Sequence, residues 1–220
     1  MPRSPAELYG RVVEVLRRDG VSGVASKCLA WLCRIFYEKG DYLVFEHDLR
    51  PTDFTPRAPN ITVTAVCSAG DLERLSGAIR ETLESAGRRL GSHLENGGMV
   101  FCVVIDGKLA HQSWVSTRLP SEVDPVASHL DYDRLAYIGA CETVPEFRGQ
   151  GLYPLVLSRI CDALRSRGFS RGMLTVSPDN GSSISGITKA GFRPAGQGRL
   201  TRCLGRYSWI HQPPAGRKEH

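Results

Sequence analysis

The stretch Val144-Pro145-Glu146-Phe147-Arg148-Gly149-Gln150-Gly151-Leu152-Tyr153 decides the fold of this chain of 220 residues. It follows an apolar, strand-like run at 135–143 and precedes a helix-like run at 152–167. A glycine-rich turn between a strand and a helix directs several backbone N–H groups to one point, where a pyrophosphate can bind. Gly149 and Gly151 let a phosphate approach the backbone closely, and Arg148 adds a positive charge.

The residues of this turn exclude two common phosphate-binding motifs. A dinucleotide-binding turn needs glycine at position 154, where Pro154 stands, and an acidic residue at the end of the next strand, where Ser177 stands. A mononucleotide P-loop ends in Gly-Lys-Ser or Gly-Lys-Thr, which this turn lacks. The turn therefore favours another phosphate-bearing cofactor, and with it an enzyme.

The turn from Arg148 to Tyr153 resembles the acyl-CoA pyrophosphate signature of the GCN5-related N-acetyltransferase (GNAT) superfamily, (Gln/Arg)-x-x-Gly-x-(Gly/Ala). It departs from this signature at the sixth position, where Tyr153 replaces a small residue. A second block also resembles the family, because Asn180 precedes a short helix that ends in Gly191-Phe192. The resemblance covers residues 61–211. The turn is similar to that of members associated with cell-surface polysaccharide biosynthesis.

The resemblance implies a fold, a cofactor and an activity. The fold is of the α/β (α+β) class, a GNAT-like mixed, mostly antiparallel central sheet flanked by helices, here with an N-terminal helical extension. The cofactor is acetyl-CoA (CoA), and the activity is acyl transfer to a primary amine by direct attack in a ternary complex. By this resemblance the cofactor-binding residues are Thr143, Val144, Arg148, Gly149, Gln150, Gly151, Leu152, Tyr153, Asn180 and Ser183.

The resemblance also implies that the main-chain N–H near Thr143 or Val144 binds the acyl carbonyl, a contribution of about 3–4 kcal/mol. Glu142 is the candidate general base, because a carboxylate near the end of an apolar strand accepts a proton more readily than one in water. The alternative is a surface or salt-bridged carboxylate. Cys141 is expected on the opposite face of the strand, as a packed core residue rather than a nucleophile.

The group that protonates the leaving thiolate is not the one found in many members. They carry a tyrosine four residues before the glycine of Gly-Phe, and this chain has Ile187 there. Ser183, Ser185 or Tyr153 can take its place, or the thiolate leaves unprotonated. The alternative for the two serines is a role as helix-cap and helix-surface groups.

The acceptor is expected to be an amine-bearing small molecule, with an amino-sugar as the first candidate. A protein or peptide amine is the second class, and a CoA-binding module without catalysis is the alternative of a different kind. His129, Asp131 and Asp133 lie in the polar segment 117–134 and can contact an acceptor, although a solvated loop is the simpler interpretation.

Composition limits the other classes of function. The net charge of +5 is modest and the arginines are scattered, so no nucleic-acid partner is expected. The six histidines have no metal-like spacing, and no metal site is expected. The seven cysteines form no C-x-x-C pair, which is typical of a reducing, cytoplasmic environment.

The chain divides into four expected parts: an N-terminal helical hairpin at 1–40, a strand and linker at 41–60, the acyltransferase domain at 61–211 and a flexible tail at 212–220. The hairpin has helices at 5–18 and 21–37. Its apolar face packs on the domain or on a partner subunit, as in a homodimer, or lies on the inner face of an anionic membrane. Strands are expected at 42–46, 61–66, 99–105, 109–116, 135–143, 172–176 and 199–210, and helices at 71–94, 152–167 and 182–190.

Overall fold

The computed structural model describes residues 37–51, 61–85, 90–118, 125–203 and 206–213. The predicted helices at 5–18 and 21–37 lie outside the described residues, apart from Tyr37, which begins a strand. Residues 40–200 and 209–213 belong to one compact unit, which holds every residue of the site. None of the described helices is both long enough and apolar enough to cross a bilayer.

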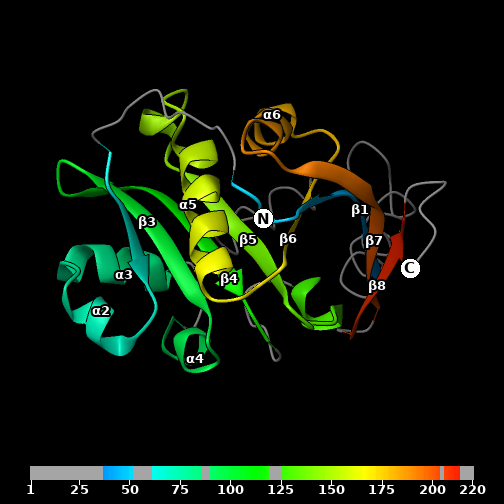
Figure 1. Cartoon of the computed structure of the whole chain (residues 1–220), viewed down its shortest axis with the longest axis horizontal. Helices are drawn as coiled ribbons and strands as arrows, with labels where there is room; N and C mark the ends of the chain where they lie inside the picture. The colour runs from blue at the N-terminus through cyan, green and yellow to red at the C-terminus, as the bar shows by residue number, and fades with distance from the viewer. Residues whose placement is uncertain (1–36, 52–60, 86–89, 119–124, 204–205, 214–220) are drawn as a thin grey trace, which may run out of the picture. The chain divides into compact units, whose positions relative to one another are not determined.

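Eight strands form one mixed sheet in the order β2-β3-β4-β5-β6-β1-β7-β8. The pairs β1 with β6, β2 with β3, β3 with β4 and β4 with β5 are antiparallel, and β5 with β6 is parallel. The predicted fold class, a mostly antiparallel sheet flanked by helices, is therefore confirmed (Figure 1). The strands are β1 (Tyr37–His47), β2 (Val63–Val66), β3 (Met99–Ile105), β4 (Lys108–Ser116), β5 (Leu135–Thr143), β6 (Arg171–Val176), β7 (Arg193–Cys203) and β8 (Arg206–Gln212).

The first described strand of the sheet is β1, which includes the predicted strand at 42–46 and precedes the predicted start of the domain at residue 61. β1 lies between β6 and β7, and its residues Leu43 to His47 pair with Val176 to Gly172. Val44 and Phe45 are both buried although they point to opposite faces, as expected for a central strand. The segment predicted as one strand at 199–210 likewise belongs to two strands, β7 and β8.

The predicted helix at 71–94 consists of shorter helices, α2 (Ala69–Glu73), α3 (Gly77–Ser85) and α4 (Leu90–Glu95). Ser68 is the N-cap of α2: its Oγ accepts from the Asp71 N–H at 3.2 Å and donates to Asp71 Oδ2 at 2.9 Å. The Cys67 N–H, which also donates to this carboxylate, is the main cause of the lowered pKa of Asp71. Residues 86–89, between α3 and α4, lie outside the described residues.

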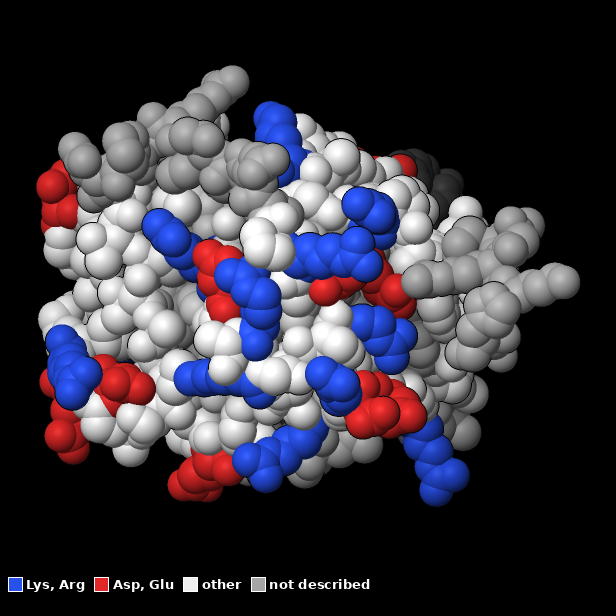
Figure 2. Space-filling view, in the orientation of Figure 1, with Lys and Arg blue, Asp and Glu red and all other residues white. Residues whose placement is uncertain are grey.

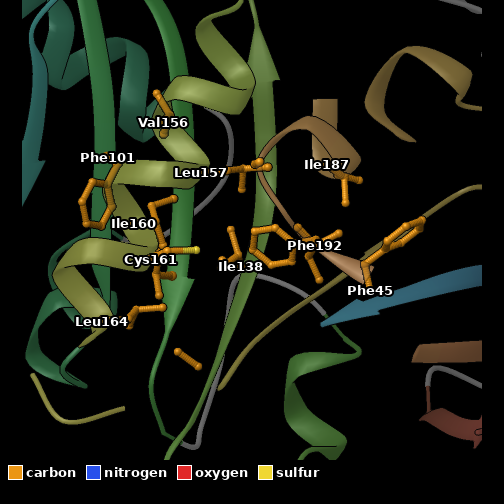
Figure 3. Packing of buried hydrophobic residues seen from close by; sticks show 14 of the residues in the cluster. Phe45, Phe101, Ile138, Val156, Leu157, Ile160, Cys161, Leu164, Ile187 and Phe192 are labelled. Carbon is orange, nitrogen blue, oxygen red and sulfur yellow. The ribbon is translucent and has the colours of Figure 1, made fainter. Parts of the chain in front are cut away.

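Helix α5 (Leu152–Ser166) covers one face of β3, β4 and β5, and α6 (Gly181–Lys189) lies beside α5 (Figure 1). Val156, Leu157, Ile160 and Leu164 recur at helical spacing and form the buried face of α5. They pack with Phe101, Ile138, Phe192 and other residues in the main core cluster (Figure 3). This packing fixes the start of α5, and with it the glycine turn, against the end of β5.

The opposite face of the sheet is covered by α3 and α4. Ile79, Leu83, Leu90 and Leu94 from these helices pack against Trp114 of β4 in a second core cluster. The two clusters hold the sheet rigidly on both faces, so side chains at the ends of β4 and β5 have fixed positions.

The position of β1 generates a testable prediction about where the folding unit begins. A chain that starts at Ile61 lacks the strand that pairs with β6. We expect it to lose cooperative unfolding in urea, because the edges of β6 and β7 and the core around Phe45 become exposed. A chain that starts at Tyr37 is the control and should unfold cooperatively. Cooperative unfolding of the shorter chain would contradict the role assigned to β1.

Candidate active site

Strands β5 and β6 separate part-way along their length. Leu135 to Ile138 of β5 pair with Arg171 to Leu174 of β6, and the described strands share no paired residues beyond this point. β5 continues to Thr143 and β6 to Val176. One edge of β5 is therefore open between Gly139 and Thr143, and its backbone groups can pair with an extended ligand.

On its other edge, β5 carries an extra residue opposite β4. Trp114 pairs with Gly139, whereas Gln112 pairs with Glu142, so the register shifts between them. Ala140, within this β-bulge, has a left-handed backbone with φ of +48°, which is unfavourable for a residue with a Cβ. Beyond the bulge, Glu142 lies on the same face as Gln112 and Trp114, and Thr143 lies on the face covered by α5.

The backbone at the end of β5 distinguishes Thr143 from Val144. The Val144 N–H donates to the Ala110 carbonyl at 3.0 Å, so it is already used within the sheet. The Thr143 carbonyl accepts a bond from Arg148 Nε at 3.1 Å and thus faces the opposite, open edge. Because successive residues of a strand direct their backbone groups to alternate edges, the Thr143 N–H also faces this edge. Of the two predicted carbonyl-binding groups, Val144 is excluded and Thr143 remains.

A cavity of about 650 Å³ lies where β5 opens, between the glycine turn, α5 and α6. It brings together most of the residues singled out from the sequence, whereas Val144 and Gln150 are not among its lining residues. Sequence reasoning missed His111 and Lys189, which also line the cavity. The lining residues are His111, Cys141, Glu142, Thr143, Phe147, Arg148, Gly149, Gly151, Leu152, Tyr153, Pro154, Asn180, Ser182, Ser183, Ser185, Gly186 and Lys189.

The glycine turn has the backbone conformation that its sequence requires. Gly149 and Gly151 have φ of +79° and +77°, in the left-handed region that favours glycine. Gly151 is the N-cap of α5 and forms no side-chain cap bond. The first N–H groups of α5 therefore remain available to an anion, at the positive end of the helix dipole. The exposed cation of Arg148 lies beside them.

Asn180 and Ser183 lie at the start of α6. Asn180 is the N-cap of this helix, and its Oδ1 accepts from the Ser183 N–H at 3.1 Å and from Ser182 Oγ at 3.0 Å. Part of the role of Asn180 is thus structural, since these bonds fix the wall of the cavity that α6 provides.

Glu142 does not have the apolar surroundings expected from the sequence. Its side chain is exposed at the cavity, and Oε2 accepts a bond from Gln112 Nε2 at 3.2 Å. The apolar residues of β5 that suggested burial, Leu135 to Gly139, precede the bulge. A carboxylate in this position is open to an incoming amine.

His111 is almost fully buried, with 1% of its surface exposed. Its Nδ1 lies 2.7 Å from Thr143 Oγ1 and its Nε2 lies 2.9 Å from Ser113 Oγ. Burial lowers the pKa of His111 to about 4, so the ring is neutral at neutral pH. A single histidine in an apolar strand gives no sequence signal of its own, and only the pairing of β4 with β5 shows that it holds Thr143.

Tyr153 lies against His111, with the two ring centroids 5.7 Å apart. Burial raises the pKa of Tyr153 well above its usual value, and the hydrogen-bonded thiol of Cys141 raises it further. The phenol is therefore protonated at neutral pH. Gly186 gives the ring its space, because a Cβ there would lie 2.8 Å from Tyr153 Cδ1. Ile187, at the position of the tyrosine found in many GNAT members, is fully buried in the core.

His129, Asp131 and Asp133 are not among the residues that line the cavity. His129 Nδ1 lies 2.9 Å from the Pro125 carbonyl, and the Asp133 N–H donates to Asp131 Oδ1 at 3.1 Å. The described residues contain no group of three histidine, cysteine, aspartate or glutamate side chains that could hold a metal ion.

Residues 84–192 match the model of the acetyltransferase (GNAT) family. This part of the chain belongs to the GNAT family. The match spans α4 to α6, and thus includes the bulge, the glycine turn and all residues that line the cavity. No curated protein matches the chain by sequence.

Solved structures of GNAT proteins share this fold. A GNAT-family acetyltransferase from Novosphingobium aromaticivorans has a TM-score of 0.52 at 20% identity, over 78% of this chain and 66% of that one. A GCN5-related N-acetyltransferase-like protein from Streptococcus suis has a TM-score of 0.51 at 12% identity, over 81% and 67%. An acetyltransferase of the GNAT family from Colwellia psychrerythraea has a TM-score of 0.50 at 18% identity, over 80% of this chain and 60% of that one. The aligned part thus spans 66% and 60% of the Novosphingobium and Colwellia chains.

The buried His111 should make the stability of the protein depend on pH. Its pKa is lowered from 6.5 to about 4 on folding, so its contribution is complete above pH 6.5 and is lost as the pH falls toward 4. Between pH 7.5 and 4.5 the free energy of unfolding should fall by about 2–3 kcal/mol more in the wild type than in His111→Gln. Urea titrations at both pH values measure this difference, and equal losses would contradict the burial of a neutral ring.

The bulge in β5 generates a second prediction, at Ala140. Because its φ is positive, Ala140→Gly should raise the free energy of unfolding by up to about 1 kcal/mol, and Ala140→Val should lower it by about 1–3 kcal/mol. The control is Ala163→Gly in α5, which should lower it by about 1 kcal/mol. Urea denaturation distinguishes the signs, and a destabilising Ala140→Gly would rule out strain at the bulge.

Proposed function

We propose that this protein is an acyl-CoA-dependent N-acyltransferase, which transfers acetyl from acetyl-CoA to a primary amine on an amino-sugar or another small molecule. The observation that carries the proposal is the continuity of the cavity, which runs from the glycine turn at the start of α5 to the open edge of β5. An anion-binding turn and an unpaired strand edge in one cavity fit a ligand that has a pyrophosphate followed by an extended, amide-bearing arm.

The residues present fit acetyl-CoA. The turn 149–151, the first N–H groups of α5 and Arg148 would hold the pyrophosphate, and Lys189 adds a second cation to the cavity. Bound acetyl-CoA would supply an activated thioester, whose carbonyl the amine would attack directly. The Thr143 N–H, held on the open edge, donates to the carbonyl oxygen as negative charge develops there.

Two ionisable side chains supply the proton transfers. Glu142 is exposed at the cavity and takes the proton of the attacking amine. Tyr153 is protonated at neutral pH and donates a proton to the leaving thiolate. Ser183, which lines the cavity at the start of α6, is the alternative donor. Cys141 is hydrogen-bonded to Tyr153 and lies on the other side of β5 from Glu142, which favours a packing role.

Small-molecule acceptors are favoured over nucleic acids by the distribution of charge. On the face shown in Figure 2, Lys and Arg side chains lie among Asp and Glu side chains rather than in a separate stripe. On α5, Asp162 forms ion pairs with Arg159 at 3.9 Å and Arg165 at 2.8 Å. A protein or peptide amine remains the second acceptor class. The cytoplasmic location, and the membrane or dimer contact through 5–37, stay predictions.

Cofactor binding is tested by calorimetry with CoA and acetyl-CoA. We expect micromolar binding to the wild type, at least tenfold weaker binding to Arg148→Ala, and loss of binding in Gly151→Asp, which adds a carboxylate where the phosphates bind. Arg159→Ala, on the exposed face of α5 and outside the cavity, is the matched control. No binding to the wild type would overturn the proposal.

Turnover is tested by CoA release from acetyl-CoA with glucosamine, spermidine and a lysine-containing peptide as acceptors. Glu142→Gln and Tyr153→Phe should each lower kcat by about 100-fold or more while the affinity for CoA is retained, because each removes one proton transfer. Unchanged rates would reject these two roles. Binding without turnover of any acceptor would favour a CoA-binding module.

A further inference from the structure

Three side chains on the face of β4 and β5 opposite α5 form a hydrogen-bonded chain. Trp114 Nε1 donates to Gln112 Oε1 at 3.0 Å, and Gln112 Nε2 donates to Glu142 Oε2 at 3.2 Å. Trp114 is fully buried and Gln112 is 6% exposed, whereas Glu142 is exposed at the cavity. The chain thus runs from the core of the protein to the wall of the cavity.

The chemistry of these groups fixes the orientation of the Gln112 amide. An indole N–H can only donate, so the group that faces Trp114 must be the amide oxygen. The NH2 group then faces Glu142, where it meets a carboxylate that, when ionised, can only accept. The reverse orientation would place the NH2 group against the indole N–H and the amide oxygen against the carboxylate. The amide therefore cannot turn over without losing both bonds.

The register of the sheet brings the chain together. Gln112 and Glu142 are paired residues of β4 and β5, immediately beyond the bulge at Ala140. Without the extra residue, the alternation of β5 would turn Glu142 to the face covered by α5. The bulge and the Gln112 amide thus act on the same carboxylate. The bulge determines the face of the sheet on which Glu142 lies, and the amide holds its Oε2.

We propose that Gln112 is a positioning residue for Glu142, held in turn by Trp114, and that it sets the orientation of the carboxylate toward the acceptor amine. This inference rests on the proposed function, in which Glu142 takes the proton of the attacking amine. Gln112 holds Oε2, which leaves Oε1 to meet the amine. Gln112 is not among the residues that line the cavity, so its effect passes through Glu142.

Kinetics with glucosamine and acetyl-CoA test the inference. Gln112→Met keeps the volume of the side chain and removes the amide. It should lower kcat by about 10–100-fold, which is less than the loss expected when the general base itself is removed. The Kd of CoA should stay within twofold of the wild type. In the Glu142→Gln background, Gln112→Met should change kcat by less than about twofold, because positioning matters only while the base is present. Gln197→Met, on an exposed position of β7, is the matched control and should leave kcat unchanged.

An NMR measurement tests the hydrogen-bonded chain without turnover. The side-chain amide signal of Gln112, assigned from Gln112→Met, should move when Glu142 is changed to Ala and also when Trp114 is changed to Phe. If the chemical shift of this signal is unchanged in both variants, the inference is overturned. Full kcat in Gln112→Met, with kcat lost in Glu142→Gln, would also overturn it and leave the proposed function intact. If the wild type turns over no acceptor, the proposed function fails, and the NMR result alone decides whether Gln112 holds Glu142.

Discussion

The extra residue in β5 is the constraint on which the rest of the site depends. Ala140 has a left-handed conformation. Between the pairs Trp114–Gly139 and Gln112–Glu142, β5 contains one residue more than β4. A bulge bends its strand and increases the local twist, and β5 leaves β6 directly after Ile138. The same distortion therefore opens the edge that carries the Thr143 N–H and sets the faces of Glu142 and Thr143. A regular β5 would close the cavity and turn Glu142 toward α5.

The two faces of the sheet provide two different environments at one opening. On the side of α5, His111 is buried and Tyr153 is partly buried, so the imidazole stays neutral and the phenol stays protonated. On the other side, Glu142 is exposed and its carboxylate is bonded to an amide. Because β5 ends at the cavity, groups from both faces reach the same space. The proposed proton donor, Tyr153, and the proposed proton acceptor, Glu142, thus reach the cavity from opposite faces of the sheet.

The sequence predicted those parts of the fold that depend on local patterns. The apolar runs at 99–105 and 135–143 coincide with β3 and β5, and the positive φ of Gly149 and Gly151 agrees with the predicted turn. What it could not predict depends on the pairing of distant segments. The place of β1 between β6 and β7, the use of the Val144 N–H by Ala110 and the contact of His111 with Thr143 all follow from register. The exposure of Glu142 follows from the bulge, and Ala140 carries no local signal for a bulge, since glycine would be the expected residue there.

The pair of Tyr153 and Gly186 explains how the turn accepts a bulky sixth residue. The ring needs space on α6, and Gly186 provides it, since even a Cβ would come within 2.8 Å of the ring. The next residue, Ile187, fills the core where many GNAT members carry a tyrosine. A phenol is therefore still present at the cavity, but it extends from the start of α5 rather than from α6. At the described cavity, an aromatic hydroxyl is thus supplied by Tyr153 at the start of α5, while Ile187 of α6 serves the core.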